Sequence, residues 1–285
     1  MSAQLLDGKA VAAQENERTR ERVRALLERG VVPGLATVLV GDNPASHVYV
    51  ANKRKTCKKL GIASVDADLP ADASEETLLE TVRRLNEDPR VHGLLVQMPL
   101  PKHIDEHRVL EAVDPQKDVD GFHPRNVGLL ALGRPWMIPC TTMGILRLLE
   151  RAEVGIAGKN AVIIGRSNIV GKPTALLLLS LHATVTLCHT RTRDLPGLVS
   201  RSELVVAAMG KAEAIRGDWI APGAVVIDVG INRVGEKLVG DVEFASARER
   251  ASLITPVPGG VGPMTIAMLM ENTVTLAERV AGGLS

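Results

Sequence analysis

The chain has 285 residues, with 34 Lys or Arg, 33 Asp or Glu and a formal net charge of +1, and 45% of it is hydrophobic. This is the composition of a globular protein with one large domain or two medium ones. Balanced charge and an aromatic content of 2% lack the basic surface and stacking platforms of nucleic-acid binders, so we expect no nucleic-acid partner.

Residues 1–27 contain neither a basic-then-apolar signal pattern nor an uncharged run long enough to cross a bilayer. The early acidic residues also argue against a transit peptide. Cys57, Cys140 and Cys188 are far apart and have no metal-binding spacing, which is typical of reduced thiols. We therefore expect a cytoplasmic protein with no membrane partner and no metal.

The first elements alternate between helix and strand. Residues 9–29 have the pattern of an amphipathic helix that ends at Gly30. The apolar run 34–41 predicts a buried strand. The next helix has Ser46 as its possible N-cap and stops at Gly61.

The same alternation continues along the chain. A strand is expected over 62–69, a helix with a capping-box start at Ser74 follows, and a third strand lies within 91–101. Four more apolar strands are expected over 159–165, 183–189, 203–210 and 223–231, with a helix directly after the first of them. Strands that alternate with helices form mainly parallel sheets, so we predict two α/β domains joined near 120–145.

The segment "VIIGRSNIVGKPTALLLL" reads as strand, glycine-rich turn and helix. Gly165, Ser167 and Gly171 form G-x-S-x-x-x-G, a variant of the dinucleotide fingerprint G-x-G-x-x-G. Free N–H groups at the start of the helix suit a pyrophosphate. The alternative is a plain glycine turn between a buried strand and a helix.

Two arginines indicate which dinucleotide would bind. Arg166 lies inside this loop, and Arg191 follows the next strand, where an NAD-binding domain usually has an acidic residue. Guanidinium groups suit a 2′-phosphate, so the sequence favours NADP over NAD. A solvated basic turn stays open as the interpretation of Arg166 and of the neighbouring Arg193.

Tyr49, the only tyrosine, lies four residues before Lys53 and shares its helix face. The ring could stack on a planar ligand while the ammonium transfers a proton. We expect the other basic residues of this helix, Arg54, Lys55, Lys58 and Lys59, to lower the pKa of Lys53. A basic surface helix is the alternative, and we prefer it for those four residues.

Polar residues also follow the third strand. Gln97 lies at its carboxyl end, where α/β proteins bind ligands. Asp118 and Asp120 lie in a glycine-containing turn, where a carboxylate could accept two N–H groups of a heterocycle or could simply cap the turn. The loop 255–265 has three prolines and three glycines and suits either a ligand or a plain crossover.

Seven segments, in order, closely resemble the bifunctional methylenetetrahydrofolate dehydrogenase/cyclohydrolase (FolD) family over nearly the whole chain. The segments are "SHVYVANKRK", "GLLVQMPLP", "KDVDGFHPRNVG", "PCTTMGIL", "GRSNIVGKP", "GINRV" and "TPVPGGVGPMT". The resemblance implies a folate-binding α/β domain, 1–138 plus 265–285, completed by the C-terminal helix. A Rossmann-type NADP-binding domain, 139–264, would be inserted into it. The resemblance also implies a homodimer and a cleft between the domains.

The resemblance implies roles for individual residues. Lys53 would be the acid/base, Tyr49 would stack on folate, Gln97 would hold Lys53 and substrate, Asp120 would bind the pterin edge, and Ser46 would support them. The remaining substrate-binding residues would be Val96, Met98, Pro258, Gly259, Gly260 and Thr265. The cofactor would contact Gly165, Arg166, Ser167, Thr190, Arg191 and Ile231. Thr190 stands where the family commonly has serine, and its hydroxyl is expected to preserve the contact.

The implied reaction oxidises 5,10-methylenetetrahydrofolate to the 5,10-methenyl cation with NADP and then hydrolyses the cation to 10-formyltetrahydrofolate. A lysine that can be neutral suits this chemistry, because a fixed positive charge would repel the cation. Alternatives are a monofunctional dehydrogenase, another two-domain Rossmann oxidoreductase such as one acting on a shikimate-like acid, and a nucleotide-sensing module without catalysis.

Overall fold

The computed structural model describes residues 2–283, which form two compact units. Among the described residues, the first unit comprises 2–13, 130–134 and 141–265, and the second comprises 14–129, 135–140 and 266–283. Each unit is built on a parallel sheet with helices. The predicted α/β class with two domains is therefore confirmed, whereas the ranges of the two functional domains stay a prediction.

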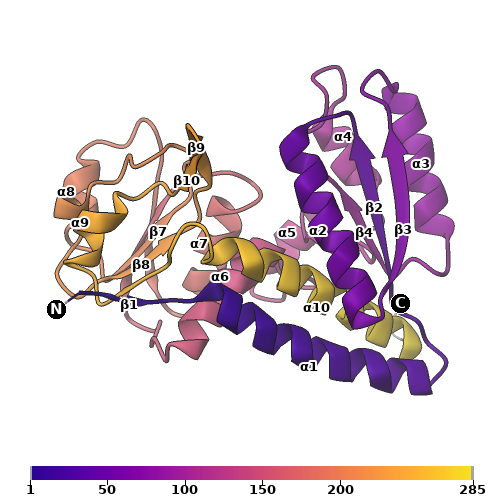
Figure 1. Ribbon diagram of the computed structural model, residues 1–285, viewed down its shortest axis with the longest axis horizontal. Coiled ribbons are helices and arrows are strands. Elements are labelled where there is room, and N and C mark those ends of the chain that lie inside the picture. Colours follow the sequence, from indigo (N-terminus) through magenta and orange to yellow (C-terminus); the bar gives the residue numbers. More distant parts are fainter. Residues whose placement is uncertain (1, 284–285) are drawn as a thin grey trace. The chain divides into compact units, whose positions relative to one another are not determined.

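The second unit contains a three-stranded parallel sheet in the order β3-β2-β4 (Figure 1). Its strands are β2 (Gly34–Val40), β3 (Ala63–Leu69) and β4 (Gly93–Val96). All seven residues of the central β2 are buried, which explains its continuous apolar run. The edge strand β3 alternates between exposed and half-buried residues, as expected where one face is solvated.

The helix α2 (Pro44–Leu60) packs against β2 and β3, but its predicted N-cap is wrong. Asn43 is the cap, because its Oδ1 accepts hydrogen bonds from the backbone N–H groups of Ala45 and Ser46 at 3.0 and 3.2 Å. Pro44 starts the helix, where its fixed φ is suitable and its missing N–H is not needed. Ser46 is consequently inside the first turn and buried. The predicted stop at Gly61 is confirmed, with φ of 81°.

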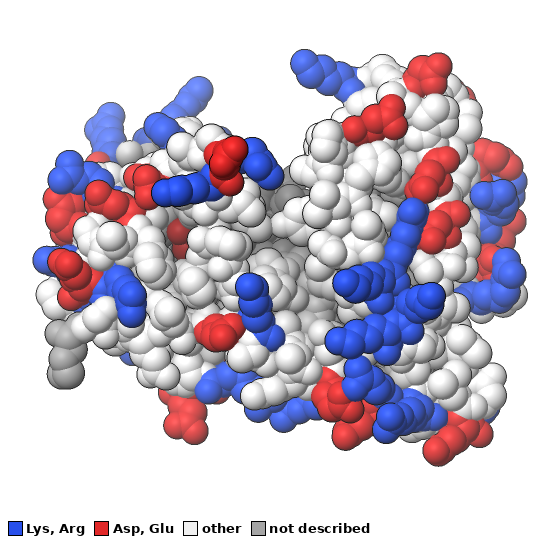
Figure 2. All heavy atoms as spheres, viewed as in Figure 1, with Lys and Arg blue, Asp and Glu red and all other residues white. Residues whose placement is uncertain are grey.

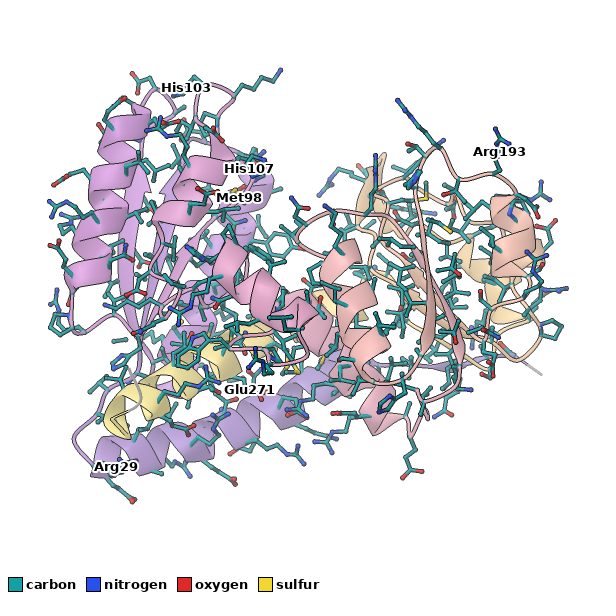
Figure 3. All side chains as sticks on the ribbon, turned by 180° about the vertical axis from the view of Figure 1, so that it is seen from behind. Arg29, Met98, His103, His107, Arg193 and Glu271 are labelled. Atoms are coloured by element: carbon teal, nitrogen blue, oxygen red, sulfur yellow. The ribbon has the colours of Figure 1, made fainter. Side chains whose placement is uncertain are left out.

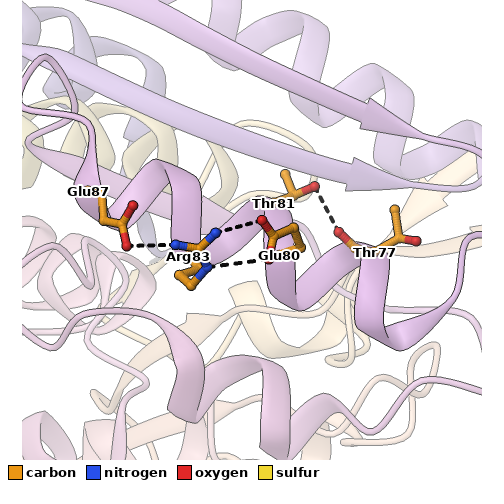
Figure 4. A network of polar contacts seen from close by, with 5 residues as sticks. All are labelled: Thr77, Glu80, Thr81, Arg83 and Glu87. Carbon is orange, nitrogen blue, oxygen red and sulfur yellow. Dashed lines mark hydrogen bonds and ion pairs between the residues drawn. The ribbon is translucent and has the colours of Figure 1, made fainter.

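The helix α3 (Glu75–Glu87) begins at Ser74 as predicted, since the Ser74 Oγ accepts the Thr77 N–H at 3.2 Å. Its surface contacts are the Thr81 hydroxyl to the Thr77 carbonyl and Arg83 to Glu80 and Glu87 (Figure 4). These ion pairs are exposed and add little stability. The unit also contains the short α4 (Glu106–Ala112), and α5 (Pro124–Ala131) follows it in the chain.

The first unit contains a six-stranded parallel sheet in the order β1-β11-β8-β7-β5-β6 (Figure 1). The four predicted strands are present with shorter bounds, as β5 (Asn160–Ile164), β6 (Thr184–Cys188), β7 (Leu204–Ala207) and β8 (Val225–Asp228). Two short strands, β1 (Gln4–Leu5) and β11 (Leu253–Ile254), were not predicted. The chain thus begins in this sheet.

The strand order of this sheet reverses at β5. The chain adds β6 on one side of β5 and then returns to place β7 on the other side. In parallel sheets the loops at the carboxyl ends of two such strands diverge, and ligands bind in the crevice between them. The topology therefore marks the loops after β5 and β7 as a candidate ligand site.

The two units also contain further helices and a hairpin. They are α1 (Gly8–Glu28), α6 (Cys140–Arg151), α7 (Gly171–Ser180), α8 (Leu195–Val199), the 3₁₀ turn Gly217–Trp219, the antiparallel hairpin β9 (Asn232–Val234) and β10 (Lys237–Val239), α9 (Phe244–Arg248) and α10 (Val261–Ala281). The expected loop 255–265 is too long, because α10 already starts at Val261. Pro263 is compatible with that first turn, where the helix does not need its N–H.

Each sheet has its own hydrophobic core. In the first unit buried aliphatic side chains of β5, β7 and β8 pack with residues such as Ile215, Ile220 and Ala247. In the second unit side chains of β2 and β4 pack against Leu78 and Val82 of α3. Within residues 2–283, the helices fall short of the length and apolar character that a membrane span requires.

Candidate active site

One face of α2 carries Lys53 into the interior of the second unit. Ser46, Val50, Lys53 and Cys57 recur at three- or four-residue intervals and are all buried. Lys53 is only 7% exposed. Tyr49, one turn earlier, is half-buried, and burial raises its pKa, so its phenol stays neutral.

The buried Lys53 ammonium is held by the loop after β4. Lys53 Nζ donates a hydrogen bond of 2.9 Å to Gln97 Oε1. Gln97 Nε2 donates to the Met98 carbonyl at 2.6 Å, which orients the amide oxygen toward the lysine. Val96, the last residue of β4, is buried, and Met98 lies at the same end of the sheet as His103 and His107 (Figure 3). The structure thus brings Lys53 and Gln97 together.

The pKa of Lys53 is lowered, as predicted, but the predicted cause is wrong. Burial of the ammonium is the main cause, and the nearby Asp120 carboxylate opposes it in part. Arg54 points to β3 instead, where it forms ion pairs of 2.9 Å with Asp66 and 2.5 Å with Asp68. The other basic residues of α2, Lys55, Lys58 and Lys59, are exposed, and Lys and Arg side chains gather over this helix in Figure 2.

Two residues of this site were not recognised from the sequence. The Cys140 thiol is buried and donates to the Val119 carbonyl at 3.6 Å, and its pKa is raised well above the usual value by burial and then by the nearby Asp120 carboxylate. Asn272 of α10 donates to the carbonyls of Val119 and Ile138 at 3.0 and 3.1 Å and lies 3.5 Å from the Cys140 Sγ. They connect the Asp120 turn to the C-terminal helix. The motif "PCTTMGIL" contained the signal for Cys140.

The two carboxylates of the turn 118–121 have different environments. Asp118 is buried and accepts hydrogen bonds from the His123 N–H and the Asn126 side chain, both at 2.8 Å, so it holds the turn. Asp120 is half-buried and acts on Lys53 and Cys140. Of the two carboxylates, Asp120 is the one whose charge is directed at the lysine.

The loop that precedes α10 belongs to the first unit, not to the unit of Lys53. Pro258 is exposed, and Gly259 has φ of 110°, a conformation that favours glycine. Gly260 is buried, and a Cβ on Gly8 would overlap its carbonyl oxygen. Thr265 lies in α10, where its hydroxyl is 3.2 Å from that of Thr141.

The glycine-rich turn after β5 is built from backbone. Gly165 has φ of 123°, and a Cβ there would overlap the Ala208 carbonyl, while a Cβ on Gly171 would overlap the Gly165 carbonyl. The Ser167 Oγ accepts the N–H groups of Val170 and Gly171 at 3.1 and 3.3 Å and so shapes the entry to α7. A turn without side chains at the start of a helix fits a dinucleotide pyrophosphate.

The other predicted cofactor residues are exposed around the carboxyl ends of β5, β6 and β8. Arg166 and Ser167 lie in the glycine-rich turn, and Thr190 and Arg191 follow β6. The Arg191 backbone N–H donates to His189 Nδ1 at 3.1 Å, and the residue is exposed. Arg193 points away from the sheet (Figure 3). Ile231, after β8, is 46% exposed, which is unusual for an isoleucine beside a buried sheet.

These features define a class of protein. It is a two-unit α/β protein with a dinucleotide-binding unit and a second unit that carries a buried lysine, hydrogen-bonded to a glutamine side chain. Two family models match it, "Tetrahydrofolate dehydrogenase/cyclohydrolase, catalytic domain" over residues 6–120 and "Tetrahydrofolate dehydrogenase/cyclohydrolase, NAD(P)-binding domain" over 139–281. The chain therefore belongs to the tetrahydrofolate dehydrogenase/cyclohydrolase family, as the resemblance of its motifs predicted. Within residues 2–283, no group of three or more His, Cys, Asp or Glu could hold a metal ion.

Individual relatives are similar to this chain over nearly their full length. The Bifunctional protein FolD of Pelobacter propionicus is 60% identical over 278 residues, or 97% of this chain and 98% of the relative. The FolD crystal structure from Campylobacter jejuni has a TM-score of 0.96 and 48% identity, and covers 98% of this chain and 100% of its own. FolD from Trypanosoma brucei, solved with NADP cofactor and inhibitor, has a TM-score of 0.96 and 42% identity, with 99% of each chain covered.

Proposed function

We propose that this enzyme catalyses two consecutive steps, the NADP-dependent oxidation of 5,10-methylenetetrahydrofolate to the 5,10-methenyl cation and hydrolysis of that cation to 10-formyltetrahydrofolate. The observation that carries the proposal is the buried Lys53 ammonium, held 2.9 Å from Gln97 with a lowered pKa. Burial makes the neutral amine more accessible than in a solvated lysine, so Lys53 can exchange the proton that the hydrolysis step requires. Family membership and full-length bifunctional relatives support the same reaction.

Lys53 and its neighbours have distinct roles in this proposal. NADP, when bound, supplies the acceptor for the hydride that leaves the methylene carbon. For hydrolysis, neutral Lys53 accepts one proton from the water whose oxygen adds to the methenyl carbon. As the bond between that carbon and the ring nitrogen breaks, the lysine gives this proton to the nitrogen, and the hydroxyl proton leaves to solvent as the formyl carbonyl forms. Because burial lowers the pKa of Lys53, its neutral form is accessible beside a cationic substrate.

The remaining residues of the second unit bind and orient the folate. The half-buried Tyr49 ring stacks on it, and Gln97 holds Lys53 and the substrate. Asp120 accepts N–H groups of the pterin edge, which its half-buried position permits. Ser46 supports this set from the buried face of α2, and Val96 and Met98 complete the contacts of this unit. The remaining proposed substrate residues, Pro258, Gly259, Gly260 and Thr265, belong to the first unit.

The first unit holds the cofactor at the carboxyl ends of its strands β5, β6 and β8. Gly165 and Ser167 receive the pyrophosphate, Thr190 and Ile231 contact the nucleotide, and the guanidinium groups of Arg166 and Arg191 face the 2′-phosphate. Arg191 is an exposed arginine after β6, and it supports a preference for NADP, because an acidic residue at this position would favour the ribose hydroxyls of NAD.

Substituting Arg191→Ala is expected to weaken NADP binding by about tenfold and to change NAD binding little, because only NADP has a phosphate for the guanidinium. Isothermal titration calorimetry with both dinucleotides measures the difference. Arg193→Ala is the matched control, since Arg193 lies two residues away and is exposed. Equal weakening of NADP and NAD in Arg191→Ala would contradict a phosphate contact.

The two activities can be separated with purified protein. We expect NADPH to form from methylenetetrahydrofolate and NADP, and methenyltetrahydrofolate supplied alone to be hydrolysed faster than in buffer. NADPH formation with accumulation of methenyltetrahydrofolate, and no enzymatic hydrolysis, would establish the monofunctional dehydrogenase instead.

We also propose a homodimer, a cytoplasmic location, and functional domains that span 1–138 plus 265–285 for folate and 139–264 for NADP. The family resemblance supports the homodimer, and the free, buried Cys57, Cys140 and Cys188 support the cytoplasmic location. The match of the NAD(P)-binding model from residue 139 supports the start of the second domain.

A further inference from the structure

The first unit contains a buried carboxylate that the proposed function does not use. This carboxylate forms hydrogen bonds with loops at the carboxyl ends of the strands. Asp241 is fully buried. Its Oδ2 accepts the N–H groups of Met209 and Gly210 at 2.6 and 2.9 Å. Its Oδ1 accepts the Lys211 N–H and the Asn232 side-chain amide, both at 2.9 Å. One side chain thus binds three consecutive N–H groups of the loop after β7 and an amide beyond β8.

A second buried carboxylate fixes Asp241 in turn. Asp228, the last residue of β8, is 2% exposed and accepts the N–H groups of Asp241 and Val242 at 2.9 Å and that of Gly230 at 3.0 Å. Burial raises the pKa of Asp228 to about 6 although these donors oppose the shift, so the carboxylate is mainly ionised at neutral pH. The two aspartates form one connected set of hydrogen bonds.

Two glycines leave the space that these carboxylates fill. A Cβ on Gly230 would overlap Asp241 Oδ1, and a Cβ on Gly240 would overlap Asp228 Oδ2. The close approach means that the loops cannot shift without breaking charge-assisted hydrogen bonds, which are stronger than neutral ones. The arrangement is therefore rigid, and it begins at the carboxyl end of β8.

These loops border the crevice that the strand order defines. The loop after β7, which Asp241 holds, lies across the reversal point from the glycine-rich turn after β5. The Ala208 carbonyl packs directly on Gly165, so the position of one loop sets the position of the other. The chain after β8 carries the exposed Ile231 next to Asn232. Asp241 consequently fixes both segments that face the glycine-rich turn.

We infer that Asp241 is a positioning residue for the dinucleotide: it holds the loops after β7 and β8 in the conformation that accepts the cofactor, without contacting the cofactor itself. The inference rests on the proposed function of the first unit. Three consecutive N–H groups form a concavity that attracts anions, and here Asp241 occupies it. Without that carboxylate, the N–H groups turn toward water and the crevice changes its shape.

Asp241→Asn is the decisive variant, because it preserves volume but puts an amide N–H₂ opposite two N–H donors. We expect the Kd for NADP to rise by about tenfold or more and the KM for NADP to rise with it. The kcat at saturating NADP should fall much less. Cyclohydrolase activity, measured with methenyltetrahydrofolate and no dinucleotide, should stay at the wild-type rate. Calorimetry with NADP gives the affinity independently of turnover.

Two further variants keep the test informative. Asn232→Ala removes one of the four donors to Asp241, at a half-buried position, and should raise the Kd for NADP by a smaller factor than Asp241→Asn. It provides the test if Asp241→Asn does not fold. Asp218→Asn is the control, since this exposed carboxylate of the same unit pairs only with the exposed Arg216. Unchanged NADP affinity in a folded Asp241→Asn, or a parallel loss of cyclohydrolase activity and thermal stability, would overturn the inference. Wild-type protein that binds NADP without oxidising folate would refute the proposed reaction but not this positioning role.

Discussion

Lys53→Met is expected to abolish cyclohydrolase activity, with a loss of about 10²–10⁴-fold in rate, while NADP binds as in the wild type. Methionine has a similar length and tolerates burial, but it has no amine to accept a proton from water. Methenyltetrahydrofolate hydrolysis, corrected for the buffer reaction, measures the effect. Lys55→Met is the control, because Lys55 is exposed two residues further along the same helix.

The pH dependence gives an independent test of the same residue. Burial lowers the pKa of Lys53 below its usual 10.5, so the neutral form increases as pH rises through a lower value. If neutral Lys53 is the base, kcat/KM for hydrolysis rises with pH through that lowered pKa and then levels off. The rise should be absent in Lys53→Met. Hydrolysis that persists in the variant with an unchanged pH profile would remove Lys53 from the mechanism.

Gly165→Val should eliminate measurable NADP binding and lower the free energy of unfolding by about 3 kcal/mol. Valine is strained at φ of 123°, and its Cβ would overlap the Ala208 carbonyl, so the turn after β5 must move away from the loop after β7. Calorimetry with NADP and urea unfolding report the two effects separately.

Gly155→Ala is the matched control for this variant, since a Cβ at Gly155 has no neighbour within 4 Å and the residue lies in the same unit. It should leave NADP affinity and stability unchanged. Wild-type affinity in a folded Gly165→Val would show that the turn is only a connection between strand and helix.

Several of the strands that were predicted from the sequence are buried along their whole length. All of β2, β7 and β8 is buried, and burial on both faces produces a continuous apolar run that is visible without a structure. The strands β1 and β11 escaped notice because each has two residues, too few for any periodicity. They form only because backbone groups from the two ends of the chain find partners on the sheet.

Helix ends were predicted correctly where they depend on neighbouring residues, and wrongly in one case where packing matters. The Gly61 stop and the Ser74 cap were predicted correctly, because each depends on residues within a few positions. Ser46 was assigned wrongly as a cap, although Asn43 and Pro44 were equally visible. In the structure it faces the interior with Lys53, a position that depends on what α2 packs against.

By itself, the sequence determined the α/β class, the glycine-rich turn, the helical spacing of Tyr49 and Lys53, and, through its motifs, the family. These features depend on local periodicity, on backbone conformation and on the order of short segments. Only the tertiary structure decided that burial lowers the pKa of Lys53, that the Met98 carbonyl orients Gln97 toward it, and that Cys140 and Asn272 join the Asp120 turn. Here a hydrogen bond joins Val119 and Asn272, which are 153 positions apart, and no local pattern encodes that proximity.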